Sequence, residues 1–363
     1  MDRHEEPLQF GWFIPTYGDS AALGDAETWS APGMELFGRV ARAAEEAGFE
    51  YALVPVATEC WEGWLTSMAV AMQTSKLKML VAARPGLVAP TLMAKMIATF
   101  DQLTGGRVLI NLIAGGGEAE MAADGLYYEH DERYEVMAES VSLMKRLWES
   151  EEPVTWEGAH FKLEKAVVKP KPLAQPPFYL GGISAAAKRV GAEHADVYLY
   201  WADLPERIAV DVASVQAEAE KVGRGDVIRH GLRALVCVRE TESEAWEAAE
   251  NITSRVTGGM KDRRAEGMGA QSKADGRMRE LASASESDGY RIAPHLWAGL
   301  TPVRHGAGVV IVGNPEQVAG QIEEYAEIGI SSFCLSGWPH DEEAERFGRL
   351  VMPLIKNRVA QLG

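Results

Sequence analysis

Eight short and almost wholly apolar runs, separated by longer segments with helical spacing, most constrain the fold of this 363-residue chain. A strand that is covered by helices on both faces of a parallel sheet reads as a continuous apolar run. Alternation of such strands with helices predicts βαβ units. The expected strands are Leu8–Ile14, Tyr51–Val56, Leu77–Ala83, Val108–Ala114, Phe178–Gly181, Val197–Trp201, Gly231–Val238 and Ser332–Ser336. Because eight strands close a barrel, we predict an α/β fold: one (β/α)8 TIM-barrel domain over residues 1–363.

The segments between the strands carry the apolar spacing of helices. The expected helices are Met34–Ala47, Leu92–Gln102, Arg133–Trp148, Leu204–Val222 and Pro315–Ile328. Pro315 follows Asn314, the order expected of a capping residue and the first residue of a helix. A two-domain, doubly wound protein is the competing fold.

Two insertions interrupt the alternation. Residues 153–172 are polar and bounded by prolines, which indicates a small excursion before the fifth strand. Residues 257–289 are rich in Gly, Arg, Lys and Ser and lack clean periodicity. The second insertion is either a solvated helical segment or a lid over the carboxyl end of the barrel.

Charge and cysteine content exclude several classes of protein. Thirty-six basic and 53 acidic side chains give a net charge of −17, so we expect no binding to nucleic acid or to an anionic membrane. A local cluster of arginines can still bind a small anion. Three widely spaced cysteines, without metal-binding spacing, predict neither disulfides nor a metal site. With no spanning or leader segment apparent, we expect a cytoplasmic protein.

Aromatic, amide and arginine side chains gather where the predicted strands end, which is the active-site end of a parallel barrel. These residues and segments are Pro15–Asp19, Cys60–Trp64, Arg84, Asn111, Gly115–Gly117, Gly181–Ser184, Trp201, Arg233, Arg304 and Trp338. Together they describe a site for a flat polar cofactor and an anion. An aldolase-type barrel that binds a substrate phosphate is a further alternative.

Two of these strand ends are rich in glycine, and they differ in how strongly they indicate a phosphate site. Gly115–Gly117 lacks the G-x-G-x-x-G pattern and is more typical of a tight turn. Gly181–Ser184 lies between a strand and a helical segment, where its amides and hydroxyl either hold a phosphate or form an ordinary turn. Because no nicotinamide fingerprint is present, redox chemistry here would need reducing equivalents from another protein.

Several longer stretches give the chain a specific resemblance. They are Phe13–Asp19, Cys60 with Trp64–Leu65, Val81–Pro85, Thr104–Arg107, His130–Tyr134, Leu296–Gly299, Val303–Arg304 and Ser336–His340. In these stretches the chain resembles the alkanesulfonate monooxygenase branch of the bacterial-luciferase-like flavin-dependent monooxygenases. The resemblance runs over nearly the whole chain and in the family's order.

The resemblance implies a two-component enzyme that uses reduced FMN and dioxygen to oxidise a substrate. In the sulfonate branch the products are an aldehyde and sulfite. The residues implied to bind FMN are Asn111, Tyr134, Gly182, Ser184 and Ala83. An NAD(P)H-dependent flavin reductase is the implied partner, and a homodimer or homotetramer is the implied assembly.

Arg233 and Arg304 are the predicted substrate-binding residues. Arg233 alternates with apolar neighbours on its strand, so its guanidinium points into the barrel, where an anion would relieve the unpaired charge. The alternatives are a buried structural ion pair for Arg233 and a surface charge for Arg304. The resemblance adds Cys60, Trp201, Tyr17 and Trp338 to the predicted catalytic pocket.

Departures from the family pattern bear on the substrate. Tyr17 and Leu235 stand where the sulfonate enzymes carry histidine, Trp338 replaces a tyrosine, and Val56 replaces a threonine. These changes remove titratable and hydroxyl groups and add aromatic surface. The substrate is therefore either an organosulfonate or an aromatic, heterocyclic or halogenated molecule. A non-catalytic flavin-binding partner subunit is the alternative from another class.

Overall fold

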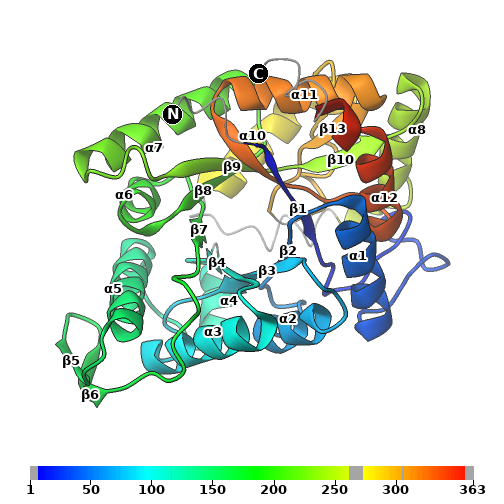
Figure 1. The fold of residues 1–363 in the computed structure, drawn as a ribbon. Helices are drawn as coiled ribbons and strands as arrows, with labels where there is room; N and C mark the ends of the chain where they lie inside the picture. The colour runs from blue at the N-terminus through cyan, green and yellow to red at the C-terminus, as the bar shows by residue number, and fades with distance from the viewer. Residues whose placement is uncertain (1–6, 116, 261–272, 305, 356–363) are drawn as a thin grey trace.

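The computed structural model of the chain describes residues 7–115, 117–260, 273–304 and 306–355. Within these residues, eight parallel strands form a closed barrel in the order β1, β14, β9, β8, β7, β4, β3, β2, and helices surround it (Figure 1). The barrel strands are β1 (Gln9–Phe13), β2 (Tyr51–Val54), β3 (Lys78–Ala83), β4 (Val108–Leu112), β7 (Phe178–Leu180), β8 (Val197–Trp201), β9 (Arg229–Arg233) and β14 (Ile330–Cys334). The closed order confirms the predicted (β/α)8 barrel and excludes the open, doubly wound sheet.

The helices follow the strands in sequence; most cover the outer face of the barrel, and α8 packs on a second sheet. They are α1 (Met34–Ala47), α2 (Gly63–Ala71), α3 (Pro90–Thr104), α4 (Glu118–Ala123), α5 (His130–Glu149), α6 (Ala185–His194), α7 (Pro205–Lys221), α8 (Glu242–Ile252), α10 (Lys273–Ser285), α11 (Pro315–Glu327) and α12 (His340–Leu350). The predicted start of α11 is confirmed. The Asn314 side chain accepts a hydrogen bond from the Gln317 N–H at 3.0 Å, and Pro315 takes the first helical position.

The prediction of one strand over Gly231–Val238 is wrong in its extent. The chain forms β9 up to Arg233, and from Leu235 it leaves the barrel as β10 (Leu235–Val238). β10 pairs with β13 (Val310–Gly313) in a second sheet of order β10, β13, β12 (Leu296–Trp297), β11 (Arg291–Ala293). Both parts of the run are buried, β9 in the barrel and β10 between α8 and the main core, and no glycine or proline separates them. The sequence therefore shows no break between them.

The two insertions take different forms. Residues 153–172 contain a hairpin, β5 (Val154–Glu157) and β6 (Lys162–Ala166), which projects from the end of α5 in Figure 1. Of residues 257–289, positions 261–272 lie outside the described residues. Residues 273–288 form α10 and the short 3-10 helix η2 (Glu286–Asp288), and Arg277 of α10 pairs with the carboxylates of Asp203 and Asp211. The lid role of this insertion stays a prediction.

Side chains on alternate residues of the barrel strands fill the interior. This cluster comprises Phe13, Tyr51, Leu53, Leu80, Leu109, Tyr179, Val197, Leu199 and Cys334. Because the side-chain period of a strand is two, Asn111 lies on the same face as Leu109, and Trp201 on the same face as Leu199. Arg233 lies on the same face as Gly231, at which an added Cβ would contact Leu199 and Val197. These three polar or aromatic residues therefore lie toward the carboxyl end of the interior.

A polar network fills the interior near the amino ends of the strands. The Tyr179 hydroxyl and the Ser332 hydroxyl donate to Gln9 Oε1 at 3.1 and 3.2 Å, and the Tyr51 hydroxyl lies 3.1 Å from Ser332 Oγ. The network occupies the end of the interior opposite to the predicted site residues. No helix in the described part of the chain is long and apolar enough to cross a bilayer.

Gly181, which follows β7, makes a close approach to β8. A Cβ added at Gly181 would lie 2.3 Å from the carbonyl oxygen of Leu199. Backbone atoms cannot move aside as a flexible side chain can, so this position requires glycine.

We expect Gly181→Ala to lower the free energy of unfolding by about 1–3 kcal/mol through this clash. The matched control is Gly320→Ala in α11, where an added Cβ meets no atom within 4 Å. That change should stabilise the protein by about 0.5–1 kcal/mol, because alanine favours the helix. Urea denaturation of both variants measures the difference. Equal stability of the two variants would contradict the proposed packing.

Candidate active site at the carboxyl end of the barrel

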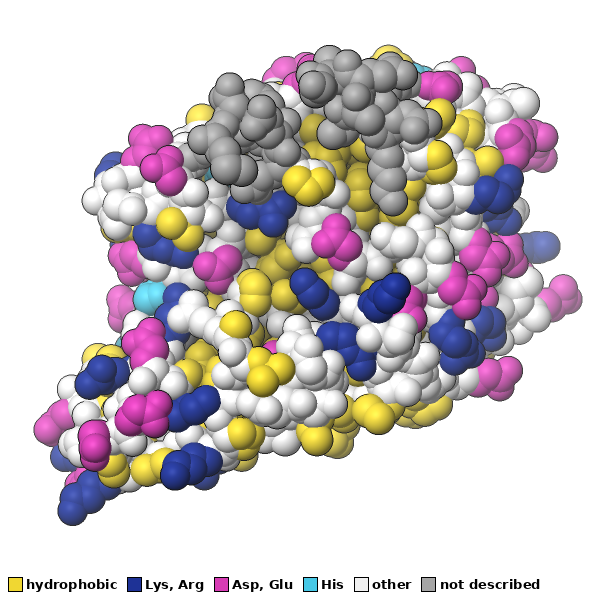
Figure 2. Space-filling model, in the orientation of Figure 1, with side chains coloured by type: hydrophobic (Ala, Val, Ile, Leu, Met, Phe, Trp, Pro, Cys, Tyr) yellow, Lys and Arg dark blue, Asp and Glu magenta, His cyan; other side chains and the backbone are white. Residues whose placement is uncertain are grey.

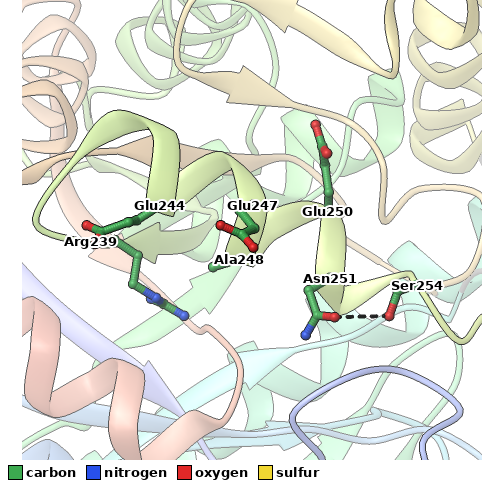
Figure 3. A pocket seen from close by; sticks show the side chains of 7 residues that line it. All are labelled: Arg239, Glu244, Glu247, Ala248, Glu250, Asn251 and Ser254. Atoms are coloured by element: carbon green, nitrogen blue, oxygen red, sulfur yellow. Dashed lines mark hydrogen bonds between the residues drawn. The ribbon is translucent and has the colours of Figure 1, made fainter.

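A surface hollow of about 630 Å³ runs along α8, but it contains none of the predicted site residues (Figure 3). It is lined by Arg239, Glu244, Glu247, Ala248, Glu250, Asn251 and Ser254. Three carboxylates outnumber the single guanidinium, so the hollow repels anions. The candidate site is therefore built from the residues that follow the barrel strands.

Arg233 is the last residue of β9, and 4% of its surface is exposed. Its guanidinium donates to the carbonyl oxygens of Ala234 at 2.7 Å and Cys334 at 3.2 Å, and to Ser336 Oγ at 2.8 Å. These partners are neutral, and within the described part of the chain no carboxylate contacts it. Burial, together with the charge of Arg304, lowers the pKa of Arg233 to about 10. A buried cation held only by neutral groups can bind an anion, as predicted for Arg233.

The Phe13 ring brings the two predicted substrate arginines together. The guanidinium carbon of Arg233 lies 4.8 Å from the centre of this ring, and that of Arg304 lies 5.9 Å from it. Arg304 also lies 5.7 Å from the centre of the Trp338 ring, and its Nη1 donates to the carbonyl oxygen of Ala307. The quadrupoles of the two rings stabilise two positive charges that otherwise repel each other.

Two further predicted catalytic residues, Tyr17 and Trp201, lie near Arg233, and a third, Cys60, lies beside Thr16 in the loop after β1. Tyr17 packs against Phe13, with 6.3 Å between ring centres, and lies within electrostatic reach of Arg233. Trp201 ends β8 at the position paired with Arg233 of β9. Cys60 is partly buried; burial raises the pKa of its thiol, and the neighbouring Thr16 hydroxyl opposes that shift only in part. The thiol is therefore protonated at neutral pH and acts here as a packing group.

The predicted phosphate-binding residues lie together where β7 leads into α6. Tyr134 comes from α5, and its hydroxyl would lie 3.2 Å from a Cβ added at Gly182. Ser184 caps α6 by accepting from the Ala187 N–H at 3.1 Å, and it hydrogen-bonds with the Tyr134 hydroxyl, which opposes the rise in the tyrosine's pKa on burial. A glycine, two hydroxyl groups and a helix N-terminus form a cradle suited to a phosphate.

Asn111 and Ala83 are placed differently. Asn111 is 6% exposed on the inner face of β4, and its amide forms no hydrogen bond with another described residue. A buried amide of this kind offers a donor and an acceptor to a ligand. Ala83 packs between the barrel and the helices, and its carbonyl oxygen accepts from the Ile113 N–H at 2.9 Å. The structure therefore does not bring Ala83 to the inner face.

Sequence reasoning did not single out Phe13 or Ser336, although both belong to stretches that carry the family resemblance. Phe13 lies on the inward alternation of β1, and this periodicity could have identified it. Ser336 follows β14, and nothing in the sequence indicates that its hydroxyl accepts from Arg233.

Comparisons with known proteins fit this geometry. The family described as luciferase-like monooxygenase matches residues 8–332. Among solved structures, a riboflavin lyase with modified FMN and riboflavin has a TM-score of 0.79 and 20% identity, over 97% of this chain and 92% of that chain. EDTA monooxygenase from Chelativorans sp. BNC1 has a TM-score of 0.76 and 17% identity, over 97% and 94%. An F420-dependent secondary alcohol dehydrogenase has a TM-score of 0.69 and 19% identity, over 96% and 99%. At these identities the three structures share the fold.

We expect Arg233→Met to raise the free energy of unfolding by about 1–3 kcal/mol, because it removes a buried charge that has no carboxylate partner. The matched control is Arg107→Met. Arg107 donates to the carbonyl oxygens of Ala71, Thr74 and Thr104, so its loss should destabilise the fold by about 1–3 kcal/mol. Thermal and urea unfolding without ligands measure both changes. A strong loss of stability in Arg233→Met would show that Arg233 serves the fold rather than a ligand.

Proposed function

Because the chain belongs to the luciferase-like monooxygenase family and is a flavin-dependent monooxygenase, we propose that it oxidises a small organosulfonate to an aldehyde and sulfite. Reduced FMN and dioxygen are the proposed co-substrates. The proposal places the chain in the alkanesulfonate branch of the family. The observation that carries it is the buried Arg233 guanidinium, held only by neutral groups beside Arg304 and the rings of Phe13 and Trp338.

The residues present fit FMN. The Gly182 backbone, the Tyr134 hydroxyl and the Ser184 hydroxyl would hold the phosphate, and the unpaired Asn111 amide would hydrogen-bond to a polar edge of the ring system. When bound, reduced FMN would supply the electrons that activate dioxygen.

A separate NAD(P)H-dependent flavin reductase is the proposed source of reduced FMN, since the sequence contains no G-x-G-x-x-G fingerprint for a nicotinamide cofactor. The proposed compartment is the cytoplasm, where three free cysteines remain reduced.

The chain's own residues bind and orient the substrate. Arg233 and Arg304 would hold the sulfonate oxygens from two sides, because three oxygens can accept from both guanidinium groups. Tyr17, Trp201 and Trp338 would cover the carbon chain and exclude water, which strengthens each charge–charge contact at the site. Uncharged, protonated Cys60 would pack beside the flavin.

The same aromatic residues favour a second substrate class. Three rings around the arginine pair offer more flat apolar surface than a short alkyl chain covers. An aromatic, heterocyclic or halogenated anion is therefore the alternative substrate, with the same cofactor and the same two arginines.

In an assay with FMN, NADH and an added flavin reductase, we expect sulfite release from alkane- or arylsulfonates. Arg233→Met should lower kcat/KM roughly a hundredfold while binding of reduced FMN is retained, because the sulfonate loses a buried charged partner. Sulfite is measured colorimetrically and dioxygen with an electrode.

Each other outcome of this assay identifies an alternative. Oxygen-dependent product without sulfite would support the aromatic or halogenated substrate. Flavin binding without substrate-coupled oxygen uptake would support the non-catalytic partner subunit. No selective affinity for reduced FMN would support an aldolase-type barrel.

We also propose that the chain forms a homodimer or homotetramer through α2 and α3. Large apolar side chains are exposed at both ends of these neighbouring helices: Leu65 (77%), Met72 (69%), Leu92 (53%) and Leu103 (67%). Figure 2 shows hydrophobic side chains along the edge where these helices lie. α2 contains no charged residue, and α3 exposes a single lysine, Lys95, so few like charges would face each other between two copies that each carry −17.

We expect Leu65→Glu with Leu103→Glu to convert the assembly to monomers, because a charge would be buried against its own copy. The matched control is Val210→Glu on α7, where an isolated side chain is 69% exposed. Analytical ultracentrifugation gives the mass of each variant. A wild-type monomer, or an oligomer that survives the double change, would contradict this interface.

A further inference from the structure

The loop between β14 and α12 contacts both substrate arginines. Ser336 Oγ accepts from Arg233 Nη2 at 2.8 Å, and the Trp338 ring lies 5.7 Å from the Arg304 guanidinium carbon. The two guanidinium groups repel each other in this apolar site, so the distance between them depends on the residues that contact them. The position of this loop therefore sets the shape of the anion site.

Asp19 lies in the loop after β1 and forms hydrogen bonds with His340, where the loop between β14 and α12 ends. Its Oδ2 accepts from the backbone N–H of His340 at 2.8 Å, and its Oδ1 lies 2.9 Å from His340 Nδ1. The Ser20 N–H also donates to Oδ1 at 2.9 Å. Asp19 is 3% exposed and His340 is fully buried. Burial alone would raise the pKa of Asp19, but His340 and the two N–H donors hold it below its ordinary value.

The His340 ring links this hydrogen-bonded pair to the aromatic groups beside the arginines. It lies 5.8 Å from the Phe13 ring and 5.3 Å from the Trp338 ring, between ring centres. Phe13 contacts both guanidinium groups, and Trp338 contacts Arg304. If Asp19 only capped α12, its bonds to backbone N–H groups would suffice, whereas its bond to Nδ1 also fixes the orientation of the ring.

We infer that Asp19 is a positioning residue for the anion site: acting through the His340 ring, it fixes Phe13 and Trp338 and thereby the spacing of Arg233 and Arg304. The inference rests on the proposed function, in which these two arginines hold the substrate anion. It predicts that a change at Asp19 alters anion affinity without altering flavin affinity.

The test measures sulfate binding by titration calorimetry, because sulfate is a simple anion that the arginine pair should bind. Sulfate that still binds to Arg233→Met marks binding at other sites and is subtracted. Asp19→Asn should weaken the Arg233-dependent sulfate affinity about tenfold and raise the sulfonate KM with little change in kcat, while affinity for reduced FMN stays at the wild-type value. The matched control is Asp101→Asn. Asp101 is also 3% exposed and accepts from a backbone N–H, that of Leu173 at 2.6 Å, but it contacts none of the site residues.

A second variant distinguishes a loss of the His340 ring from a general loss of folding. His340→Asn keeps a donor for Asp19 but removes the ring between Phe13 and Trp338, so it should weaken sulfate binding to a similar degree, even if Asp19→Asn fails to fold. Wild-type sulfate affinity in either folded variant, or an equal loss in Asp101→Asn, would overturn this inference and leave the proposed function intact. Absence of Arg233-dependent sulfate binding in the wild type would overturn both.

Discussion

The site depends on a single energetic constraint, a guanidinium buried inside a barrel with only neutral partners. Arg233 ends β9 on the inner face, and two carbonyl oxygens and the Ser336 hydroxyl receive its donors. Desolvating a charge in this way costs free energy that no carboxylate in the described residues recovers. The Phe13 ring, the Trp338 ring and the second guanidinium of Arg304 are arranged around it. We propose that a bound anion offsets this cost.

The remainder of the barrel positions this site. Hydrogen bonds among Gln9, Tyr51, Tyr179 and Ser332 fill the amino end, opposite to the predicted site residues. The close approach of Gly181 to the Leu199 carbonyl draws β7 and β8 together beside the Gly182 cradle. The residues predicted to bind flavin and substrate therefore come from different strands of one closed sheet, which fixes their separation.

Sequence patterns predicted part of each barrel strand, because burial on both faces leaves an apolar run at most of them. β9 carries two arginines and a histidine, and the prediction covered only its last three residues. The patterns also placed Arg233 inward, since its neighbours alternate on β9. The division of Gly231–Val238 was not predictable, because both parts are buried and no glycine or proline separates them. Ala83 was expected at the flavin, but it lies one residue from the inward alternation of β3, so its side chain faces the helices. The Asp19–His340 pair joins residues 321 positions apart, and no local pattern encodes such a contact.

Anomalous diffraction from crystals that contain a brominated alkanesulfonate tests the central claim most directly, because it locates the ligand without reference to turnover. The account predicts a sulfonate within hydrogen-bond distance of both the Arg233 and the Arg304 guanidinium groups, with the bromine signal among Tyr17, Trp201 and Trp338. A ligand bound only in the hollow along α8 would contradict this expectation. So would a crystal structure in which a carboxylate of the protein pairs with Arg233.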